Sequence, residues 1–299
     1  MTAEIEGRGG LPFSKMHGAG NDYIYIDATE TVPSDPAALA IEISDRHFGV
    51  GSDGLVLILH SEEADFRMRM FNSDGSEAEM CGNATRCIGK YVYEMGLTDK
   101  TTLTLATKAG IKHLTLHLKE GKVDEVTVDM GTPVLSPALI PVESIAPDAK
   151  ISEIEIIDNH QYRITAVGMG NPHAVIFVDE PTDDLVLGQG PALEKARIFP
   201  NKSNIEFASV TDRHNIRMRV WERGTGETLA CGTGACATAV AGVLNGLTDR
   251  DVNVHLRGGT LRIHWDAESG HVMMTGPARF VCHGTYIRNS SFAVASLEV

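Results

Sequence analysis

The sequence contains no stretch of about twenty uninterrupted apolar residues, the length that a membrane-spanning helix requires. Its first residues, Met1 to Leu11, are polar and include no apolar core of the kind that secretion signals carry. We therefore expect a cytoplasmic protein that has no membrane partner.

Basic residues are also scarce, because 26 Lys and Arg face 40 Asp and Glu among the 299 residues. The resulting formal net charge of −14 at pH 7 repels phosphate backbones, so we expect no nucleic-acid partner. The chain is nevertheless long enough for two domains, each with a core of its own.

Cysteine is sparse, and an odd number of five argues against a scaffold held together by disulfides. In a reducing compartment such cysteines serve as free thiols, catalytic groups or metal ligands. The sequence has no Cys-x-x-Cys motif and no His at ligand spacing, so we expect no metal. No lysine lies in a phosphate-binding loop, and the Gly-containing run 18–22 precedes a predicted strand, so we also expect no pyridoxal phosphate and no dinucleotide cofactor.

What the sequence does contain is an internal echo at an offset of 150 residues. Asn21 and Cys81 are 60 residues apart, and so are Asn171 and Cys231. At the same offset further glycine and acidic positions coincide, namely Gly20 with Gly170, Glu77 with Glu227 and Gly82 with Gly232. The order of predicted strands and helices repeats as well. We therefore predict two α/β domains of like architecture, residues 1–130 and 131–276.

Cys81 and Cys231 each end a polar loop and begin a predicted helix. The apolar pattern of the first helix ends at Gly96, and the second helix is predicted to run to about Asn245, before Gly246. A helix N-terminus presents unpaired N–H groups and partial positive charge, which should lower the pKa of a cysteine from about 8.5 toward neutrality. The same N–H groups can hold a carboxylate.

Two such helix starts that face one cavity would hold an amino acid between two sulfur atoms. One sulfur, as thiolate, would remove the α-proton while the other, as thiol, donates a proton to the opposite face. The N–H groups would stabilise the negative charge that develops on the carboxylate. Gly82 and Gly232 would let the substrate approach the backbone closely. The pattern thus predicts inversion of one stereocentre of a free amino acid without a cofactor.

Other interpretations of the cysteines stay open at this point. A lone cysteine is often only a small buried hydrophobic residue. Cys87 and Cys236 fall on apolar helix faces, so we predict that both belong to the core. A non-catalytic, redox-sensing protein, in which the cysteines form a reversible disulfide or bind a metal, is a further alternative.

The sequence resembles the diaminopimelate epimerase family over roughly residues 13–284. The resemblance rests on the segments 13–22, 71–76, 81–83, 170–173, 222–224 and 231–234. It implies an isomerase that interconverts LL- and meso-2,6-diaminopimelate in the synthesis of lysine and peptidoglycan precursors. It also implies an α/β (α+β) fold of two pseudo-symmetric domains, each a curled, mainly antiparallel sheet around a central helix. The chain would return to the first domain at about 277–299, and the protein would be a homodimer.

By the same resemblance Cys81 and Cys231 are the catalytic pair, and His173 and Glu222 set the pKa values of their thiols. The residues implied to bind substrate are Asn21, Asn72, Gly82, Asn83, Asn171, Asn204, Glu222, Arg223, Gly232 and Thr233. A guanidinium pairs with a carboxylate through two hydrogen bonds, so Arg223 suits a carboxylate at the far end of the substrate. Gly54 stands where many family members carry Gln, so any contact of that Gln is either absent or taken over by water. The two Cys-Gly elements alone would also suit a racemase of another amino acid, such as histidine or proline.

Overall fold

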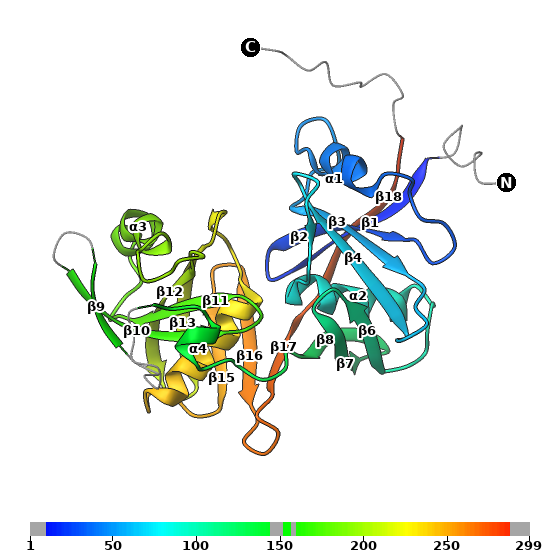
Figure 1. Ribbon diagram of the computed structural model, residues 1–299. Helices are drawn as coiled ribbons and strands as arrows, with labels where there is room; N and C mark the ends of the chain where they lie inside the picture. Colours follow the sequence, from blue (N-terminus) through cyan, green and yellow to red (C-terminus); the bar gives the residue numbers. More distant parts are fainter. Residues whose placement is uncertain (1–9, 144–151, 157–159, 288–299) are drawn as a thin grey trace, which may run out of the picture.

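The computed structural model describes residues 10–143, 152–156 and 160–287, and it shows two lobes of similar build (Figure 1). Residues 1–9, which make up most of the segment inspected for a secretion signal, lie outside the described residues. Residues 288–299, the end of the predicted chain return, lie outside them as well. Within the described part of the chain, no helix is both long and apolar enough to cross a membrane.

The first lobe is a set of strands that curl around one long helix (Figure 1). Its elements are β1 (Leu11–Gly18), β2 (Asn21–Asp27), α1 (Pro36–Ser44), β3 (Gly54–Leu59), β4 (Phe66–Asn72), β5 (Glu77–Ala78), α2 (Gly82–Glu94), β6 (Thr102–Thr107), β7 (Gly110–Lys119) and β8 (Lys122–Asp129). The long central helix is α2, which begins immediately after Cys81, as the sequence predicts.

The second lobe repeats this plan around α4. Its elements are η1 (Pro137–Leu139), β9 (Ser152–Ile156), β10 (His160–Gly168), β11 (Pro172–Phe177), η2 (Asp184–Gln189), α3 (Gly190–Glu194), β12 (Asn204–Asp212), β13 (Asn215–Glu222), β14 (Gly226–Glu227), α4 (Gly232–Leu244), β15 (Asp251–Leu256), β16 (Gly259–Trp265) and β17 (Val272–Pro277), and the chain then returns to the first lobe as β18 (Arg279–Tyr286). Helix α4 begins immediately after Cys231, the counterpart of Cys81.

The pairing of the strands shows that the two lobes share one topology. Most neighbours are antiparallel, but β2 pairs with β3, and β4 with β6, in parallel. The second lobe has the same two exceptions, because β11 pairs with β12, and β13 with β15, in parallel. The predicted α/β fold of two pseudo-symmetric, mainly antiparallel halves is therefore confirmed.

Both central helices are enclosed by their sheets, which explains their composition. Residues 82–92 of α2 and nearly all of residues 232–242 of α4 are buried. Small residues make this close packing possible: a Cβ added to Gly89 would lie 2.9 Å from Leu116, and one added to Gly242 would lie 2.4 Å from Oγ1 of Thr248. Cys87 and Cys236 are fully buried, which confirms that both belong to the core.

The last two strands connect the lobes. β17 pairs with β16 on one side and with β8 on the other, so the sheet runs without a break from the second lobe into the first. β18 then pairs along the length of β1 in the first lobe. This connection brings the N-termini of α2 and α4, and thus the two cysteines before them, into the same region of the molecule.

Candidate active site

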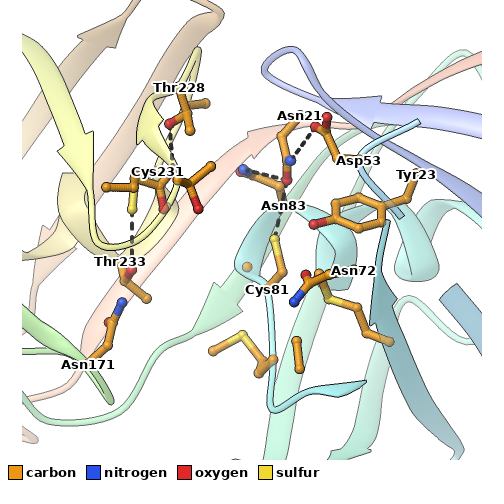
Figure 2. A pocket seen from close by; sticks show the side chains of 18 of the residues that line it. Asn21, Tyr23, Asp53, Asn72, Cys81, Asn83, Asn171, Thr228, Cys231 and Thr233 are labelled. Carbon is orange, nitrogen blue, oxygen red and sulfur yellow. Dashed lines mark hydrogen bonds between the residues drawn. The ribbon is translucent and has the colours of Figure 1, made fainter. Parts of the chain in front are cut away.

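One cavity of about 1260 Å³ lies between the lobes, and both cysteines line it. Figure 2 shows Cys81 and Cys231 on opposite walls, each at the start of its helix. The sequence-predicted residues that line the cavity are Asn21, Asn72, Cys81, Gly82, Asn83, Asn171, Glu222, Arg223, Cys231, Gly232 and Thr233. The fold thus brings most of the predicted site together from both halves of the chain.

The two helix starts share one geometry. Cys81 and Cys231 both have extended backbone, and neither helix start is capped by a side chain. The first N–H groups of each helix are therefore left available to a ligand. Met274 of β17 packs beneath both starts: a Cβ added to Gly82 would lie 2.6 Å from its Cε, and one added to Gly232 would lie 3.1 Å from its sulfur. Glycine at these positions thus also lets both helices pack closely on Met274.

An ion pair holds the loop before each cysteine. Nε of Arg69 lies 2.8 Å from Oε1 of Glu77, and Nε of Arg219 lies 2.8 Å from Oε1 of Glu227. The hydrogen bond from Arg69 is the main reason that the pKa of Glu77 falls to about 2. Arg69 and Arg219 lie 150 residues apart, as Glu77 and Glu227 do. The same offset in the sequence could therefore have predicted that the two arginines are equivalent.

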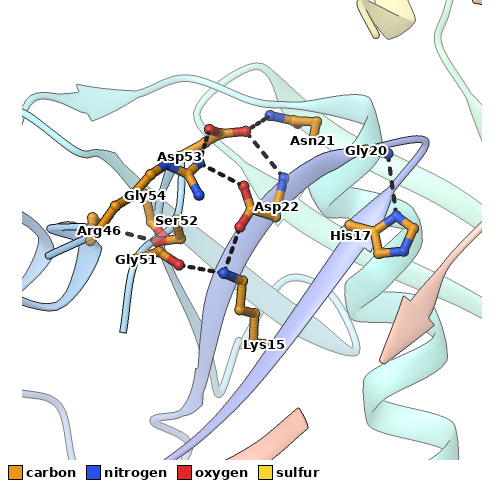
Figure 3. A network of polar contacts seen from close by, with 11 residues as sticks. Lys15, His17, Gly20, Asn21, Asp22, Arg46, Gly51, Ser52, Asp53 and Gly54 are labelled. Carbon is orange, nitrogen blue, oxygen red and sulfur yellow. Dashed lines mark hydrogen bonds and ion pairs between the residues drawn. The ribbon is translucent and has the colours of Figure 1, made fainter. Parts of the chain in front are cut away.

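A chain of hydrogen bonds positions Asn21 beside Cys81. The sulfur of Cys81 donates to Oδ1 of Asn21 at 3.4 Å, and Nδ2 of Asn83 donates to the same oxygen at 3.3 Å. Nδ2 of Asn21 donates to Asp53 at 2.8 Å, and Asp53 in turn accepts from Arg46 at 2.9 Å (Figure 3). The sequence offered no signal for the roles of Asp53 and Arg46, because their importance depends on long-range contacts.

A different set of groups lies behind Cys231. Nδ1 of His173 donates to Glu206 at 2.6 Å, and both side chains are fully buried. Nε2 of His173 lies 2.9 Å from Oδ1 of Asn171. His173 therefore lies behind the wall of the cavity and reaches it through Asn171, which does line it. Glu206, which sequence reasoning missed, lies under the start of α4, 2.8 Å from a Cβ added to Gly234.

Comparison with known proteins decides the family. The family model for diaminopimelate epimerase matches residues 13–136 and 165–281. The chain is 56% identical over 282 residues to the diaminopimelate epimerase of Desulfovibrio desulfuricans, with 92% of this chain and 98% of that protein covered. It is 51% identical over 280 residues to that of Agathobacter rectalis, with the same coverage. The chain belongs to the diaminopimelate epimerase family.

Solved structures of other proteins share the fold of this family. A hydroxyproline epimerase from Agrobacterium vitis matches with a TM-score of 0.65 and 15% identity, covering 94% of this chain and 93% of that one. A phenazine biosynthesis protein of the PhzF family from Bacillus anthracis matches with a TM-score of 0.64 and 19% identity, covering 92% and 98%. At these identities the likeness concerns the fold alone. Membership of the diaminopimelate epimerase family makes the protein an isomerase.

Like His173, two further residues that the resemblance singles out, Asn204 and Gly54, do not line the cavity of this epimerase. The side chain of Asn204 is buried, where Nδ2 donates to the carbonyl of Pro172 at 2.8 Å and Oδ1 accepts from the backbone N–H of Arg223 at 2.9 Å. Asn204 therefore positions the backbone of Arg223. A Cβ added to Gly54 would lie 2.1 Å from the carbonyl oxygen of Phe71, so this backbone has no room for a longer side chain.

The prediction that the helix starts lower the pKa of the thiols is wrong for this structure. Burial raises the pKa of Cys81, although the N–H groups of Ala84 and Asn83 oppose it. Burial, followed by the charge of Glu222, raises the pKa of Cys231 well above its ordinary value. The reason is that loss of solvation outweighs a few N–H dipoles when a sulfur is enclosed. Both thiols are therefore protonated near neutral pH in this arrangement.

Proposed function

We propose that the epimerase interconverts LL- and meso-2,6-diaminopimelate, with Cys81 and Cys231 as opposed acid and base. The observation that carries this proposal is that both cysteines, each at the start of a buried helix, line one cavity from opposite walls (Figure 2). A carboxylate held by the N–H groups at 82–83 and 232–233 would place its α-carbon between the two sulfurs.

The reaction transfers one proton in and one proton out. The thiolate of one cysteine removes the α-proton, and the electron pair moves toward the carboxylate, where the helix N–H groups stabilise it. The thiol of the other cysteine then donates its proton to the opposite face of the α-carbon. The sulfur that was the base ends as a thiol and the other ends as a thiolate, so each protonation state of the pair serves one direction of the reaction.

Glu222 connects substrate binding with formation of the thiolate. Its negative charge raises the pKa of both Cys81 and Cys231, and burial raises the pKa of Glu222 itself. An ammonium group of the substrate that pairs with Glu222 would cancel this charge. The pKa of the thiols then falls, because the nearby negative charge no longer opposes the thiolate. Substrate binding thereby favours the ionised form that the reaction needs.

The far end of the substrate suits the remaining polar groups. Arg223 lines the cavity, and its backbone is fixed through Asn204, so its guanidinium can pair with a distal carboxylate. Asn72 and Asn171 line the cavity as well and offer amide groups to the distal ammonium and carboxylate. This chemistry requires charges at both ends of the substrate and disfavours an amino acid with a plain side chain.

Solvent exchange tests the proposed function. In D₂O, the protein should introduce deuterium at the α-carbon of LL-diaminopimelate with no added cofactor, and Cys81→Ala and Cys231→Ala should each abolish inversion. Cys282→Ala is the matched control, since Cys282 is an exposed thiol outside the cavity. Full activity in either of the first two variants would refute the two-base mechanism. Exchange into histidine or proline, without exchange into diaminopimelate, would refute the proposed substrate.

We also propose that the protein works in the cytoplasm as a homodimer. The resemblance to the family supports the dimer, and the free thiols of all five cysteines are compatible with a reducing compartment. Sedimentation equilibrium at micromolar concentration tests the assembly, and a monomer at that concentration would contradict it.

A further inference from the structure

Tyr23 is a polar side chain of the cavity that the mechanism above does not use. It lines the wall that carries Cys81, and only 6% of the residue is exposed (Figure 2). In the echo of 150 residues its counterpart is His173. Both side chains follow an asparagine of the site by two residues on equivalent strands, β2 and β11. A polar ring thus stands beside each cysteine loop, and the two rings differ in chemistry.

Gly54 makes room for the ring of Tyr23. A Cβ added to Gly54 would lie 2.8 Å from Cε1 of Tyr23, so any side chain at this position would displace the phenol. The counterpart of Gly54 is Asn204, which carries a side chain in the second lobe. Glycine at position 54 is therefore what allows the phenol ring of Tyr23 to occupy this place. The phenol fills space at the wall that a longer residue 54 would claim.

The hydroxyl of Tyr23 lies in the cavity, next to the polar groups that surround Asn21. Asp53 can only accept, so the Nδ2 group of Asn21 must face it, as the 2.8 Å contact shows (Figure 3). Oδ1 of Asn21 accepts from the sulfur of Cys81 and from Nδ2 of Asn83, so these hydrogen bonds of the amide do not involve the phenol. Figure 2 shows the phenol oxygen of Tyr23 directed into the cavity on the side of Cys81, where its O–H can donate to a ligand.

We propose that Tyr23 is a further substrate-binding residue, whose hydroxyl donates a hydrogen bond to the carboxylate at the reacting centre. The inference rests on the proposed function, because it needs an amino acid between Cys81 and Cys231. Burial raises the pKa of Tyr23 well above 10, so the phenol keeps its proton and remains a donor. A neutral donor beside the helix N–H groups adds to the stabilisation of a carboxylate without introducing a charge.

Tyr23→Phe tests the proposal, because it removes one hydroxyl and keeps the ring over Gly54. Tyr25→Phe is the matched control: it is the same substitution two residues further on the same strand, at a side chain that is fully buried away from the cavity. We expect kcat/KM for LL-diaminopimelate to fall about tenfold or more in Tyr23→Phe, as for loss of a hydrogen bond to a charged group. Tyr25→Phe should stay within about twofold of the unchanged protein.

A ligand without amino groups identifies the group that the hydroxyl contacts. Pimelate is the same dicarboxylate without the two amino groups, and its binding is measured by protection of the cavity thiols from iodoacetamide, which needs no turnover. If Tyr23 binds a carboxylate, the dissociation constant of pimelate rises in Tyr23→Phe by about the factor seen in kcat/KM. The proposal would be overturned if Tyr23→Phe bound pimelate with the same dissociation constant as the protein without substitutions. It would also be overturned if pimelate gave that protein no protection, or if Tyr25→Phe weakened pimelate binding as much as Tyr23→Phe. Absence of turnover together with the expected rise for pimelate would refute the proposed function but not the carboxylate contact.

Discussion

Replacement of Glu206 by Gln should make Cys231 easier to ionise at a modest cost in stability. Glu206 is fully buried; Oε1 accepts from His173 at 2.6 Å, and Oε2 has no partner within the part of the chain that the structure describes. Its charge contributes, after burial and Glu222, to the raised pKa of Cys231. Gln keeps the shape and the acceptor for His173 but carries no charge, so the pKa of Cys231 falls.

The cost in stability follows from the hydrogen bond that is weakened. A hydrogen bond to a charged group contributes about 1.5–3 kcal/mol, and a neutral one about 0.5–1.5 kcal/mol, so Glu206→Gln should lower the free energy of unfolding by about 1 kcal/mol. Glu206→Val copies Val56, the residue at the equivalent position of the first lobe. It leaves His173 without its acceptor and should cost about 3 kcal/mol or more. Urea unfolding of both variants measures these differences.

Alkylation of the thiols measures the change at the site. Iodoacetamide reacts with the thiolate, so its rate at fixed pH rises as the pKa of a cysteine falls, by up to about tenfold for each unit. Peptide mass spectrometry follows Cys231 and, as an internal reference in the same sample, Cys81. We expect faster modification of Cys231 in Glu206→Gln and little change at Cys81. Equal rates at Cys231 in both proteins would refute the argument that Glu206 acts on this thiol through its charge.

Three further predictions follow from other contacts. Gly54→Ala should lower the free energy of unfolding by about 1–3 kcal/mol, because the new Cβ would lie 2.1 Å from a backbone carbonyl oxygen. Gly188→Ala is the control: no atom lies within 4 Å of the added Cβ, so the midpoint of urea unfolding should stay unchanged or rise slightly. Arg223→Lys should raise KM about tenfold or more with a smaller change in kcat, because an ammonium cannot pair with a carboxylate through two parallel hydrogen bonds; steady-state kinetics would show it. The pKa of Glu77 is lowered to about 2, so the ionised carboxylate stabilises the folded protein above pH 4.5, and this stabilisation is lost as the pH falls toward 2. Between about pH 5 and pH 3, the free energy of unfolding measured in urea should therefore fall less in Glu77→Gln than in the protein without the substitution.

Local patterns were enough to predict the elements that carry the cysteines. Both helices begin after the expected cysteines, and they end at Glu94 and Leu244. Gly96 and Gly246, the predicted stops, follow these ends with positive φ angles of 75° and 68°. A helix stop depends on the conformational freedom of one residue, so neighbouring sequence suffices to find it. The offset of 150 residues predicted the two-lobed fold for a similar reason, because repeated order implies repeated structure.

The surroundings of the thiols could not be predicted in the same way. Asp53 is 32 residues from Asn21, and Glu206 is 33 residues from His173, yet these contacts orient the polar groups behind the two cysteines. The pKa of each thiol depends on how completely the folded chain excludes water from it, which no local pattern records. A helix start therefore predicted the position of each sulfur correctly and the direction of its pKa shift wrongly.

At two pairs of equivalent positions, one lobe has a buried charge and the other lobe has a neutral residue. This difference affects how easily each thiol ionises. Arg86, a fully buried guanidinium whose charge lowers the pKa of Cys81, stands where the second lobe has Cys236. Glu206, which raises the pKa of Cys231, stands where the first lobe has Val56. A perfectly symmetric pair of thiols would have no preference for which sulfur is ionised, and the two protonation states would be equally populated. Here burial raises the pKa of both thiols, but the nearby buried charges raise it further at Cys231 than at Cys81, so two sulfurs in matching backbone geometry differ in how easily they ionise.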